Sequence, residues 1–362
     1  MKFIFGKTML LASALLFSIT GIGCSSDDSP ASEKEKTHDM SGVAKGADVS
    51  WLTEMEGDGV KFYNKEGKAT ECLALLRDLG VNSIRLRVWV NPDGGWCGKD
   101  DVVKKACRAQ QLGFRLMIDF HYSDTWADPA HQTVPAAWKG YTFEQMKQAV
   151  ATHTTEVLKA LRDRGVSNVE WVQVGNETRD GMLWNDLDVS VTGRCSKNAA
   201  NFAAYVNAGY DAVKDVYPSA KVIVHIDEGN TLSRYTWIFD ELRNHGGKWD
   251  VIGMSLYPED DNWQTQTTDC LNNIKKLSQQ YSCKVVVSEV GMWSGSAEAA
   301  SMMKKMVDGC KDISACEGIF YWEPEVYNGW KPANYTTLGW NAYTKGAFDD
   351  NGKPTAVFDA FK

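Results

Sequence analysis

The sequence predicts a closed (β/α)₈ barrel, the TIM-barrel fold, built as a single domain. From about Val43 onward, short β-branched runs alternate with longer segments of helical period, which is typical of a parallel sheet with crossover helices. Eight such runs occur without an obvious domain boundary, and the 362-residue chain suits one barrel of ordinary size. No GxGxxG or GxxxxGK[ST] pattern follows a strand. An open nucleotide-binding sheet is therefore less well supported than a barrel.

The eight predicted strands follow one another at the spacing of βα units. They are expected near Gly46–Trp51, Ser83–Val90, Arg115–His121, Val169–Asn176, Val222–Ile226, Val251–Tyr257, Val285–Glu289 and Gly318–Trp322. Apolar residues recur at helical spacing between them, as in Leu75, Leu76 and Leu79, and in Met302, Met303 and Met306. These stripes predict helix faces packed on the barrel.

The first 24 residues have the pattern of an export signal. Lys2 and Lys7 precede an apolar run that ends near Ile22, and Gly23 and Cys24 follow it. This run is too short for a stable membrane-spanning helix. It resembles a bacterial lipoprotein signal peptide, residues 1–24, that ends at a lipidated Cys24, although Gly21 stands where the usual pattern prefers Leu.

A polar and charged segment separates this signal from the barrel. Residues 25–42 are expected to be a disordered tether, and residues 43–362 the barrel domain. The acidic start of the tether, from Ser25 to Asp28, resembles the tag of lipoproteins at the outer face of the outer membrane. A cell-surface lipoprotein is thus expected, and a periplasmic or secreted protein is the alternative.

Eight cysteines remain after Cys24, an even number that permits disulfides in an exported chain. Pairs with short loops are Cys97 with Cys107, Cys270 with Cys283, and Cys310 with Cys316, which leaves Cys72 and Cys195. The sequence does not determine the pairing. No CxxC motif or Cys/His cluster indicates zinc.

Charge and composition narrow the class of ligand. The net charge is −8 without a basic run, which argues against nucleic acid and favours a neutral ligand. The 14 tryptophans often stand beside Asp, Asn or Gly in segments expected to be loops. Flat rings next to hydrogen-bonding groups suit sugars, although large aromatic residues also fill large cores.

Polar residues gather at the predicted carboxyl ends of the strands, where the active sites of barrel enzymes lie. In chain order they are Asp48, Arg85 with Arg87, His121, Asn176 with Glu177, Asp227 with Glu228, Tyr257, Glu289, and Trp322 with Glu323. A purely structural strand would stay apolar there. We therefore expect these residues to surround a site.

Glu177 and Glu289 are the candidate catalytic pair. They end the fourth and seventh strands, on roughly opposite sides of an eight-stranded barrel, so the two carboxyl groups can face each other. Glycoside cleavage needs one protonated and one ionised carboxyl group. Arg85 could keep Glu289 ionised, and Tyr257 could donate a hydrogen bond to the same carboxylate.

Three further residues are expected to bind the sugar. The Asn176 amide could hold a 2-hydroxyl if the chain turns at the strand end, because adjacent side chains in a regular strand point to opposite faces. His121 could bind another hydroxyl, and Trp322 could form an apolar floor under the ring. A buried polar network unrelated to substrate stays an alternative for His121 and for Arg85.

These residues carry a resemblance to a known family. The Gly175-Asn176-Glu177 triplet, Glu289 and Trp322 resemble the clan of retaining glycosidases with paired Glu on strands four and seven. Within that clan, the chain resembles glycoside hydrolase family 53, the arabinogalactan endo-β-1,4-galactanases, from about Val43 to the C-terminus. The segments that carry this likeness are His121–Pro129 with Gln132, Pro135 and Trp138, Lys45–Ser50, Arg85–Trp89 and Tyr321–Pro324.

The resemblance implies an endo-hydrolase of β-1,4-galactan that retains the anomeric configuration. It implies that Glu177 is the acid/base, that Glu289 is the nucleophile, and that the two carboxyl groups lie roughly 5 to 5.5 Å apart. It also implies that Asp124 and Trp126 belong to the galactan-binding cleft. Their neighbours Thr125, Ala127 and Asp128 are expected there too, together with Asp48, Asp227 and Glu228 from the strand ends.

No cofactor is expected. Several bacterial members of the family carry a calcium-binding stretch after the nucleophile strand, but the corresponding residues 291–296 offer almost no ligands here, so that calcium site is expected to be absent. Asp260, Asp261 and Asn262 could bind a hard cation, although a solvated acidic loop is the simpler interpretation. A monomer is expected, because a tethered enzyme with an open cleft needs no partner subunit.

Two alternatives stay open at this point. Another enzyme of the clan, a mannanase or a β-glucanase, would share the two glutamates but should lack the Asp124–Asp128 run. A non-catalytic surface glycan-binding protein would keep aromatic subsites and lose one of the glutamates, whereas both are present.

Overall fold

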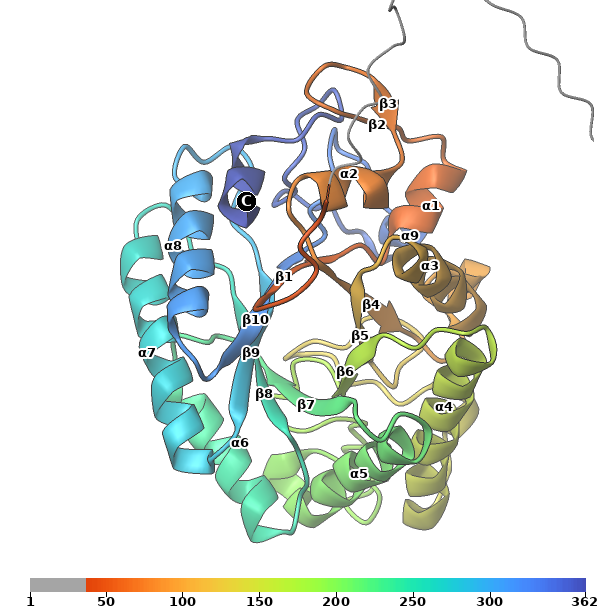
Figure 1. The fold of residues 1–362 in the computed structure, drawn as a ribbon. Helices are drawn as coiled ribbons and strands as arrows, with labels where there is room; N and C mark the ends of the chain where they lie inside the picture. The colour runs from red at the N-terminus through yellow and green to blue at the C-terminus, as the bar shows by residue number, and fades with distance from the viewer. Residues whose placement is uncertain (1–36) are drawn as a thin grey trace, which may run out of the picture. The chain divides into compact units, whose positions relative to one another are not determined.

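The computed structural model describes residues 37–362 and forms a closed barrel of eight parallel strands (Figure 1). Neighbouring strands around the barrel follow the order β1-β10-β9-β8-β7-β6-β5-β4, and β4 pairs again with β1. The strands are β1 (Ala44–Asp48), β4 (Ser83–Val88), β5 (Arg115–Phe120), β6 (Val169–Val174), β7 (Lys221–Ile226), β8 (Val251–Leu256), β9 (Lys284–Val290) and β10 (Cys316–Trp322). The predicted fold class is confirmed.

Helices surround the barrel as an outer ring (Figure 1). They are α1 (Leu52–Gly57), α2 (Cys72–Asp78), α3 (Lys99–Gln111), α4 (Phe143–Asp163), α5 (Cys195–Val216), α6 (Leu232–Asn244), α7 (Trp263–Tyr281), α8 (Ala299–Asp312) and the short α9 (Ala333–Leu338). The hairpin β2 (Phe62–Tyr63) and β3 (Ala69–Thr70) lies in the first βα connection. The long helix α4 starts with a capping box between Thr142 and Gln145 and presents Val150 and Val157 to the core.

Each predicted strand overlaps a barrel strand, but some ends differ. The first was expected to reach Trp51, whereas β1 ends at Asp48 because the chain turns into α1 at Leu52. The second ends at Val88, and the backbone N–H of Trp89 donates to the carbonyl of Cys97 instead of to a neighbouring strand. Strand ends are set by hydrogen-bond partners, which residue type alone does not specify.

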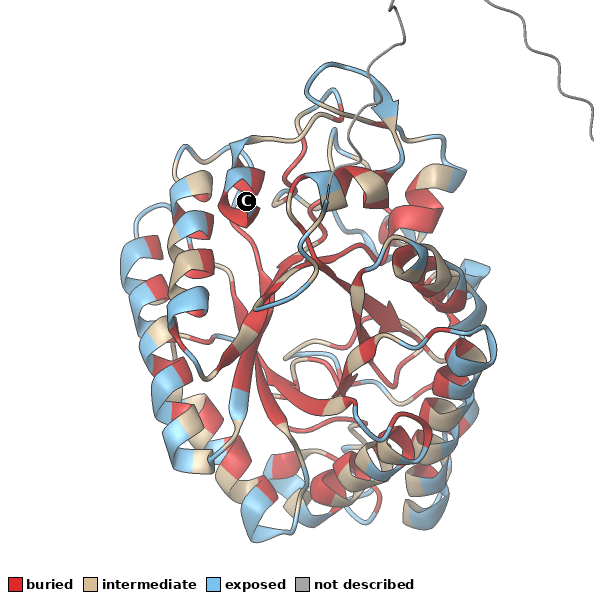
Figure 2. Cartoon of the chain, in the orientation of Figure 1, coloured by how far each residue is buried: buried red, intermediate tan, exposed pale blue. Residues whose placement is uncertain are grey.

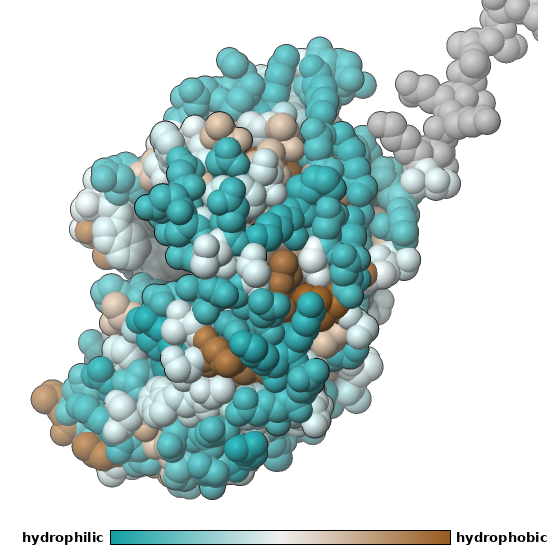
Figure 3. All heavy atoms as spheres, turned by 90° about the vertical axis from the view of Figure 1, so that its left-hand side faces the viewer, coloured by the Kyte–Doolittle hydropathy of each residue, from teal (hydrophilic) through white to brown (hydrophobic). Residues whose placement is uncertain are grey.

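Helix burial is one-sided throughout the ring. Figure 2 shows the inward sides of the helices buried and their outward sides exposed. The face shown in Figure 3 is mainly hydrophilic, with small separated apolar patches. Within residues 37–362, no helix is both long and apolar enough to cross a membrane.

The barrel interior has its own apolar cluster, which we call the lower layer. Its members are Ala44, Met117, Trp171, Ile223, Val251, Val286 and Phe320. The rings of Trp171 and Phe320 meet edge to face at 5.8 Å, although β6 and β10 are on opposite sides of the barrel, so the contact passes through its centre. Gly46 leaves room for this packing, because a Cβ there would lie 2.1 Å from the Phe320 ring.

The N-terminal predictions fall mostly outside the described residues, which begin at Thr37. Cys24, the signal peptide 1–24 and the tether up to residue 36 are not described. The last part of the predicted tether is described and contacts the barrel: His38 Nε2 lies 2.8 Å from Asp78 Oδ1, and Met40 packs against the core.

The eight described cysteines are free in the structure. Cys97 precedes α3 and Cys107 lies in its middle, and Cys270 and Cys283 are likewise separated by half of α7. At 1.5 Å per residue these separations exceed the reach of a disulfide, so the structure contradicts both short-loop pairs. Cys310 and Cys316 do lie in side-chain contact as thiols.

Candidate active site

The barrel mouth holds a pocket of about 220 Å³ between the two candidate glutamates. Its lining residues are His121, Trp126, Ala127, Asp128, Asn176, Glu177, Tyr257, Glu289, Trp322, Tyr335 and Trp340. All except the last two were predicted from the sequence. The pocket lies at the carboxyl ends of the strands, as expected for a barrel.

Left-handed backbone at the strand ends turns adjacent side chains into the same pocket. After β6, Gly175 and Glu177 have φ values of 84° and 44°, and both Asn176 and Glu177 line the pocket. Tyr122 and Glu228, two positions after the ends of β5 and β7, and Glu323, directly after β10, repeat this geometry with φ values of 50°, 52° and 49°. Such values are uncommon outside glycine and mark constrained backbone near functional sites.

Glu289 is held by two protein groups. Arg85 Nη2 lies 2.9 Å from one carboxylate oxygen, and the Tyr257 hydroxyl donates to the other at 2.7 Å. Burial has the largest effect and raises the pKa of Glu289 above its ordinary value, although the Arg85 cation and the Tyr257 hydrogen bond oppose this shift. Both sequence-predicted contacts of this carboxylate are therefore present.

Among the described residues, no cation lies in hydrogen-bond contact with Glu177. Burial, followed by the negative charges of Glu289 and Asp227, raises its pKa well above the ordinary range, and a hydrogen bond from Ser255 opposes this shift. Burial lowers the pKa of His225 well below its ordinary value, so this ring is neutral. Its Nδ1 accepts from the Glu177 backbone N–H at 3.3 Å, which leaves Nε2–H to donate to Ser255 Oγ at 2.8 Å.

The two carboxyl groups therefore differ as glycoside cleavage requires. Glu289 sits beside a guanidinium that favours its ionised form, whereas Glu177 faces other carboxylates that favour its protonated form. A pair of acids whose environments separate their pKa values can act as proton donor and nucleophile.

A buried polar network beneath the pocket positions these groups; we call it the upper layer. Arg85 is 1% exposed and binds Asp48 Oδ2 at 2.7 Å, Asp119 Oδ2 at 2.8 Å and Asn176 Oδ1 at 2.8 Å, besides Glu289. The upper layer consists of Asp48, Arg85, Asp119, Gln173, Asn176, His225, Ser255 and Glu289.

The sequence reasoning missed four members of the upper layer. Asp119, Gln173, His225 and Ser255 are the penultimate residues of β5, β6, β7 and β8, and all four are buried. Glu289 is the penultimate residue of β9. A polar residue at the same place in consecutive apolar strands was the available signal, because equivalent positions of neighbouring strands point into one layer of the barrel.

Aromatic rings form the remaining wall of the pocket. Trp126 meets Trp322 at 5.7 Å, Tyr335 at 6.2 Å and Trp340 at 6.5 Å between ring centroids. The buried Arg87 guanidinium lies 4.4 Å from the centre of the Trp126 ring. The same guanidinium forms a salt bridge with Glu323. Tyr335 and Trp340 lie in and after α9, in the irregular C-terminal segment where the strand-end rule gave no guidance.

Several predicted binding residues lie behind or beside the pocket. Asp48 and Arg85 belong to the buried network, and Asp124 and Thr125 line a separate hollow of about 390 Å³ with Trp51 and Trp89.

Asp227 and Glu228 also do not line the pocket, because they pair with arginines. Both carboxylates form ion pairs with Arg179 and with Arg234. A direct contact of either carboxylate with sugar stays a prediction.

No group of three or more His, Cys, Asp or Glu side chains in residues 37–362 is arranged to hold a metal ion. Asp260, one of the residues considered for a cation, accepts a hydrogen bond from the Ser296 hydroxyl.

Comparison with known proteins places the geometry in a family. The model of "Glycosyl hydrolase family 53" matches residues 44–300. An "Uncharacterized protein in bgaB 5'region" of Niallia circulans is 36% identical over 67% of this chain, and the match spans 66% of that protein, just under two thirds. A "Probable arabinogalactan endo-beta-1,4-galactanase A" of Aspergillus fumigatus is 34% identical, with 78% of this chain and 84% of that protein covered.

Solved structures agree. The fold matches a fungal β-1,4-galactanase with a TM-score of 0.75 at 27% identity, covering 87% of this chain and 98% of the other. It matches the GH53 catalytic domain of Ignisphaera aggregans with a TM-score of 0.77 at 29% identity, covering 88% and 95%.

Proposed function

The chain belongs to glycosyl hydrolase family 53, and from this membership and the geometry of the pocket we propose that it is an arabinogalactan endo-β-1,4-galactanase. It hydrolyses internal β-1,4-galactosidic bonds in the type I (arabino)galactan side chains of pectin, with retention of configuration. The observation that carries this proposal is the pair of unlike carboxyl groups, Glu177 and Glu289, at one pocket walled by tryptophan.

In the first step, a carboxylate oxygen of Glu289 attacks the anomeric carbon of the bound galactosyl unit. The bond to the leaving oxygen breaks as Glu177 gives its proton to that oxygen, and a glycosyl ester on Glu289 forms. Glu177 suits this role because burial and nearby carboxylates raise its pKa and so favour its protonated form.

In the second step, the roles reverse at Glu177. The carboxylate now takes a proton from water, whose oxygen attacks the same anomeric carbon and releases Glu289. The two inversions give net retention. Arg85 and Tyr257 then hold the regenerated Glu289 carboxylate for the next cycle.

The pocket walls supply the binding groups. Trp322 and Trp126 offer apolar surface to the sugar, and His121, Asp128 and Asn176 offer polar groups at the same opening. His121 accepts hydrogen bonds from Trp89 and from the Ala127 backbone through Nδ1, so its ring is held in one orientation.

The substrate assignment rests on the relatives. Galactanases are similar to this chain over about four fifths of its length, and segment 121–128, which carries the family likeness, contributes four lining residues. The xylanase structures that share the fold are only 15–16% identical and support the fold alone. Both glutamates are present, which disfavours a non-catalytic glycan-binding protein.

The test is product analysis with the soluble domain that lacks residues 1–24. The protein is incubated with debranched β-1,4-galactan, mannan and β-glucan, and product sizes are followed over time. Galacto-oligosaccharides of intermediate length should appear first, from galactan alone. Cleavage of mannan or β-glucan instead of galactan would show that the proposed substrate is wrong. Binding of galactan without cleavage would support the alternative of a glycan-binding protein.

Membrane attachment and assembly belong to the same proposal. We propose that Cys24, outside the described residues, carries the lipid anchor and that the enzyme is a monomeric outer-membrane lipoprotein at the cell surface. Radiolabelled palmitate should be incorporated by the native chain and not by Cys24→Ala. Protease treatment of intact cells should remove the enzyme, whereas protection would favour a periplasmic location.

A further inference from the structure

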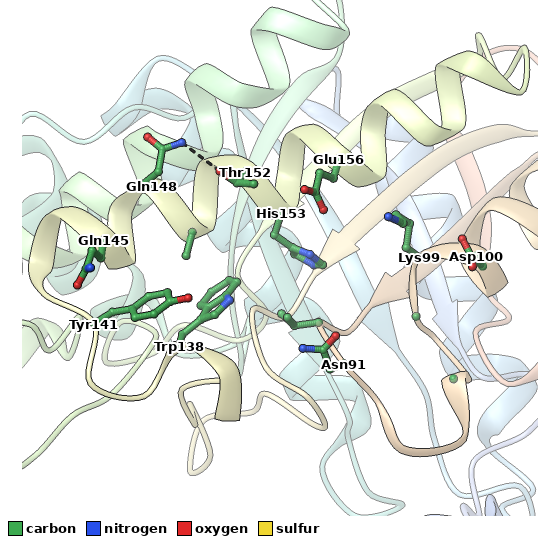
Figure 4. Close-up of a pocket in the computed structure, with 14 residues that line it drawn as sticks. Asn91, Lys99, Asp100, Trp138, Tyr141, Gln145, Gln148, Thr152, His153 and Glu156 are labelled. Atoms are coloured by element: carbon green, nitrogen blue, oxygen red, sulfur yellow. Dashed lines mark hydrogen bonds between the residues drawn. The ribbon is translucent and has the colours of Figure 1, made fainter.

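The outer surface between α3 and α4 carries a groove of about 750 Å³, larger than the pocket at the two glutamates. Its walls come from the loop after β4, the start of α3, the loop after β5 and the outward face of α4 (Figure 4). No residue lines both the groove and the catalytic pocket. The groove is therefore separate from the site described above.

Two aromatic rings form one wall of the groove. Trp138 and Tyr141 lie side by side in the loop that precedes α4 (Figure 4). Trp138 is buried and packs edge to face against His153 at 6.1 Å, whereas Tyr141 is half-buried and lines the groove. A partly exposed ring beside polar groups is suited to one face of a sugar.

Amides and a hydroxyl surround these rings. Asn91, Gln145 and Gln148 are exposed and line the groove, and Gln148 donates a hydrogen bond to the Thr152 hydroxyl at 3.0 Å. Each amide offers both donors and an acceptor, which is the combination that sugar hydroxyl groups require.

His153 adds an unsatisfied polar atom. Its buried Nε2 has no hydrogen-bond partner within residues 37–362, and Figure 4 shows the ring between Trp138 and Lys99 at the groove. Burial, with a smaller contribution from Lys99, lowers the pKa of His153 to about 4, so the ring is neutral at pH 7.

The charges along the groove favour a neutral ligand. The charged lining residues are one cation, Lys99, and two anions, Asp100 and Glu156. Recognition of acidic sugars or phosphate uses clustered cations, above all arginine, and this lining has none.

Hydrogen bonds to Asp124 connect the loops of the groove to the segment that lines the catalytic pocket. Asp124 accepts hydrogen bonds from the backbone N–H of Asn91 at 3.0 Å and of Ala136 at 2.7 Å, so it joins the two loops that form the groove. Asp124 directly precedes Thr125 and Trp126, and Trp126 lines the catalytic pocket. The groove and the catalytic pocket are thus held at a fixed separation.

We propose that the groove between α3 and α4 is a second glycan-binding site, which holds a neutral stretch of polysaccharide while another stretch occupies the catalytic pocket. The lining of the groove indicates that the ligand is neutral and rich in hydroxyl groups. The choice of β-1,4-galactan as that ligand rests on the proposed function. Two linked contacts raise the effective concentration of a long chain at the enzyme, and a short oligosaccharide that fills only the catalytic pocket gains nothing.

The first test is affinity electrophoresis in native gels that contain debranched galactan, with E289Q as the non-cleaving parent. Adding Tyr141→Ala and Gln148→Ala should raise the dissociation constant about tenfold, the size expected for losing a stacking contact and a hydrogen bond. Trp237→Ala is the matched control, because Trp237 is an exposed ring on α6 outside the groove. Equal retardation of all variants would overturn the proposal.

A second variant guards against a folding artefact, since Tyr141 also packs against the core. Asn91→Ala with Gln148→Ala removes only exposed side chains and should also weaken retardation, with an unchanged melting temperature. Retardation lost only with Tyr141→Ala, together with a lower melting temperature, would assign Tyr141 a packing role and overturn the proposal.

The active enzyme separates this inference from the proposed function. Groove variants should lower kcat/KM several-fold on galactan polymer and leave it unchanged on a short galacto-oligosaccharide; an equal fall on both would contradict a separate site. Cleavage of galactan without any effect of the groove variants refutes the groove alone. If the groove variants change retardation but the enzyme does not cleave galactan, the enzymatic function alone is refuted. If polygalacturonan retards the protein and galactan does not, the proposal that the groove binds a neutral glycan is refuted.

Discussion

The lower and upper layers of the barrel interior are built from the same strands and have opposite character. In β6, Trp171 fills the lower layer against Phe320, and two residues later Gln173 donates hydrogen bonds to Asp119 and Asn176 in the upper layer. Both levels are buried. The lower layer contains only apolar side chains, whereas the upper layer binds one arginine to three carboxylates.

This difference shows which layer serves stability and which serves chemistry. The hydrophobic effect does not depend on the orientation of the side chains, so the lower layer should tolerate apolar substitutions that keep its volume. Desolvated charges cost free energy unless each has partners, so a buried polar layer is kept where its geometry is used. The two layers should therefore respond differently to substitution.

The largest effect is expected at the two carboxyl groups. Glu289→Gln removes the nucleophile, and Glu177→Gln removes proton donation, so each should lower kcat on galactan by roughly 100- to 10,000-fold. Folding should survive: burial raises the pKa of Glu177 in the folded protein, so stability falls as pH rises from the ordinary carboxyl pKa through this raised pKa, and a neutral Gln removes that loss. Near-native turnover by either variant would refute the two-carboxylate assignment.

Truncation in the lower layer should produce the opposite result. Trp171→Ala leaves a cavity against Phe320 and should lower the free energy of unfolding by about 3–5 kcal/mol, measured by urea denaturation. Activity per folded molecule should stay close to native, and Trp171→Phe should lose less stability. A variant with native stability and lost activity would abolish the distinction between the layers.

A smaller effect is expected at the edge of the upper layer. Tyr257→Phe removes a hydrogen bond that lowers the pKa of Glu289, so that pKa should rise. Glu289 must be ionised to attack, and activity is lost as pH falls through its pKa; the acid limb of kcat/KM should therefore move to higher pH by about one unit. Tyr343→Phe is the control, because Tyr343 donates to the Trp322 carbonyl at 3.2 Å. An unshifted acid limb in Tyr257→Phe would show that the hydrogen bond does not tune Glu289.

Metal removal should have the smallest effect. We propose that the charges of the upper layer are balanced by protein groups, with Arg85 in contact with all three of its carboxylates. Dialysis against EDTA should leave turnover and melting temperature unchanged. A loss that calcium restores would reveal a structural cation and contradict this balance.

The strand pattern and the strand-end residues were readable from the sequence because both follow local rules. Alternation of β-branched runs with helical stripes predicted eight parallel strands, and the carboxyl-end rule selected Glu177, Glu289, Tyr257 and Trp322, all of which line the pocket. To predict that these four residues meet in one pocket, it was enough to assume that the strands close into a barrel.

The same rule was less discriminating at neighbouring positions. Asp227 and Glu228 also end a strand, yet they pair with Arg179 and Arg234 instead of lining the pocket. Tyr335 was missed because it approaches Trp126 from the C-terminal segment, more than 200 residues away along the chain. Sequence order carries no signal for either arrangement.

The sequence alone determined the barrel, its strand order along the chain and the chemical identity of the pair Glu177 and Glu289. The contacts of Glu289 with Arg85 and Tyr257 were also expected, whereas only the tertiary structure decided the environment of Glu177, which Ser255 and His225 approach from the neighbouring strands. A pKa depends on burial and on charges within a few ångströms, and those distances exist only once the barrel has closed.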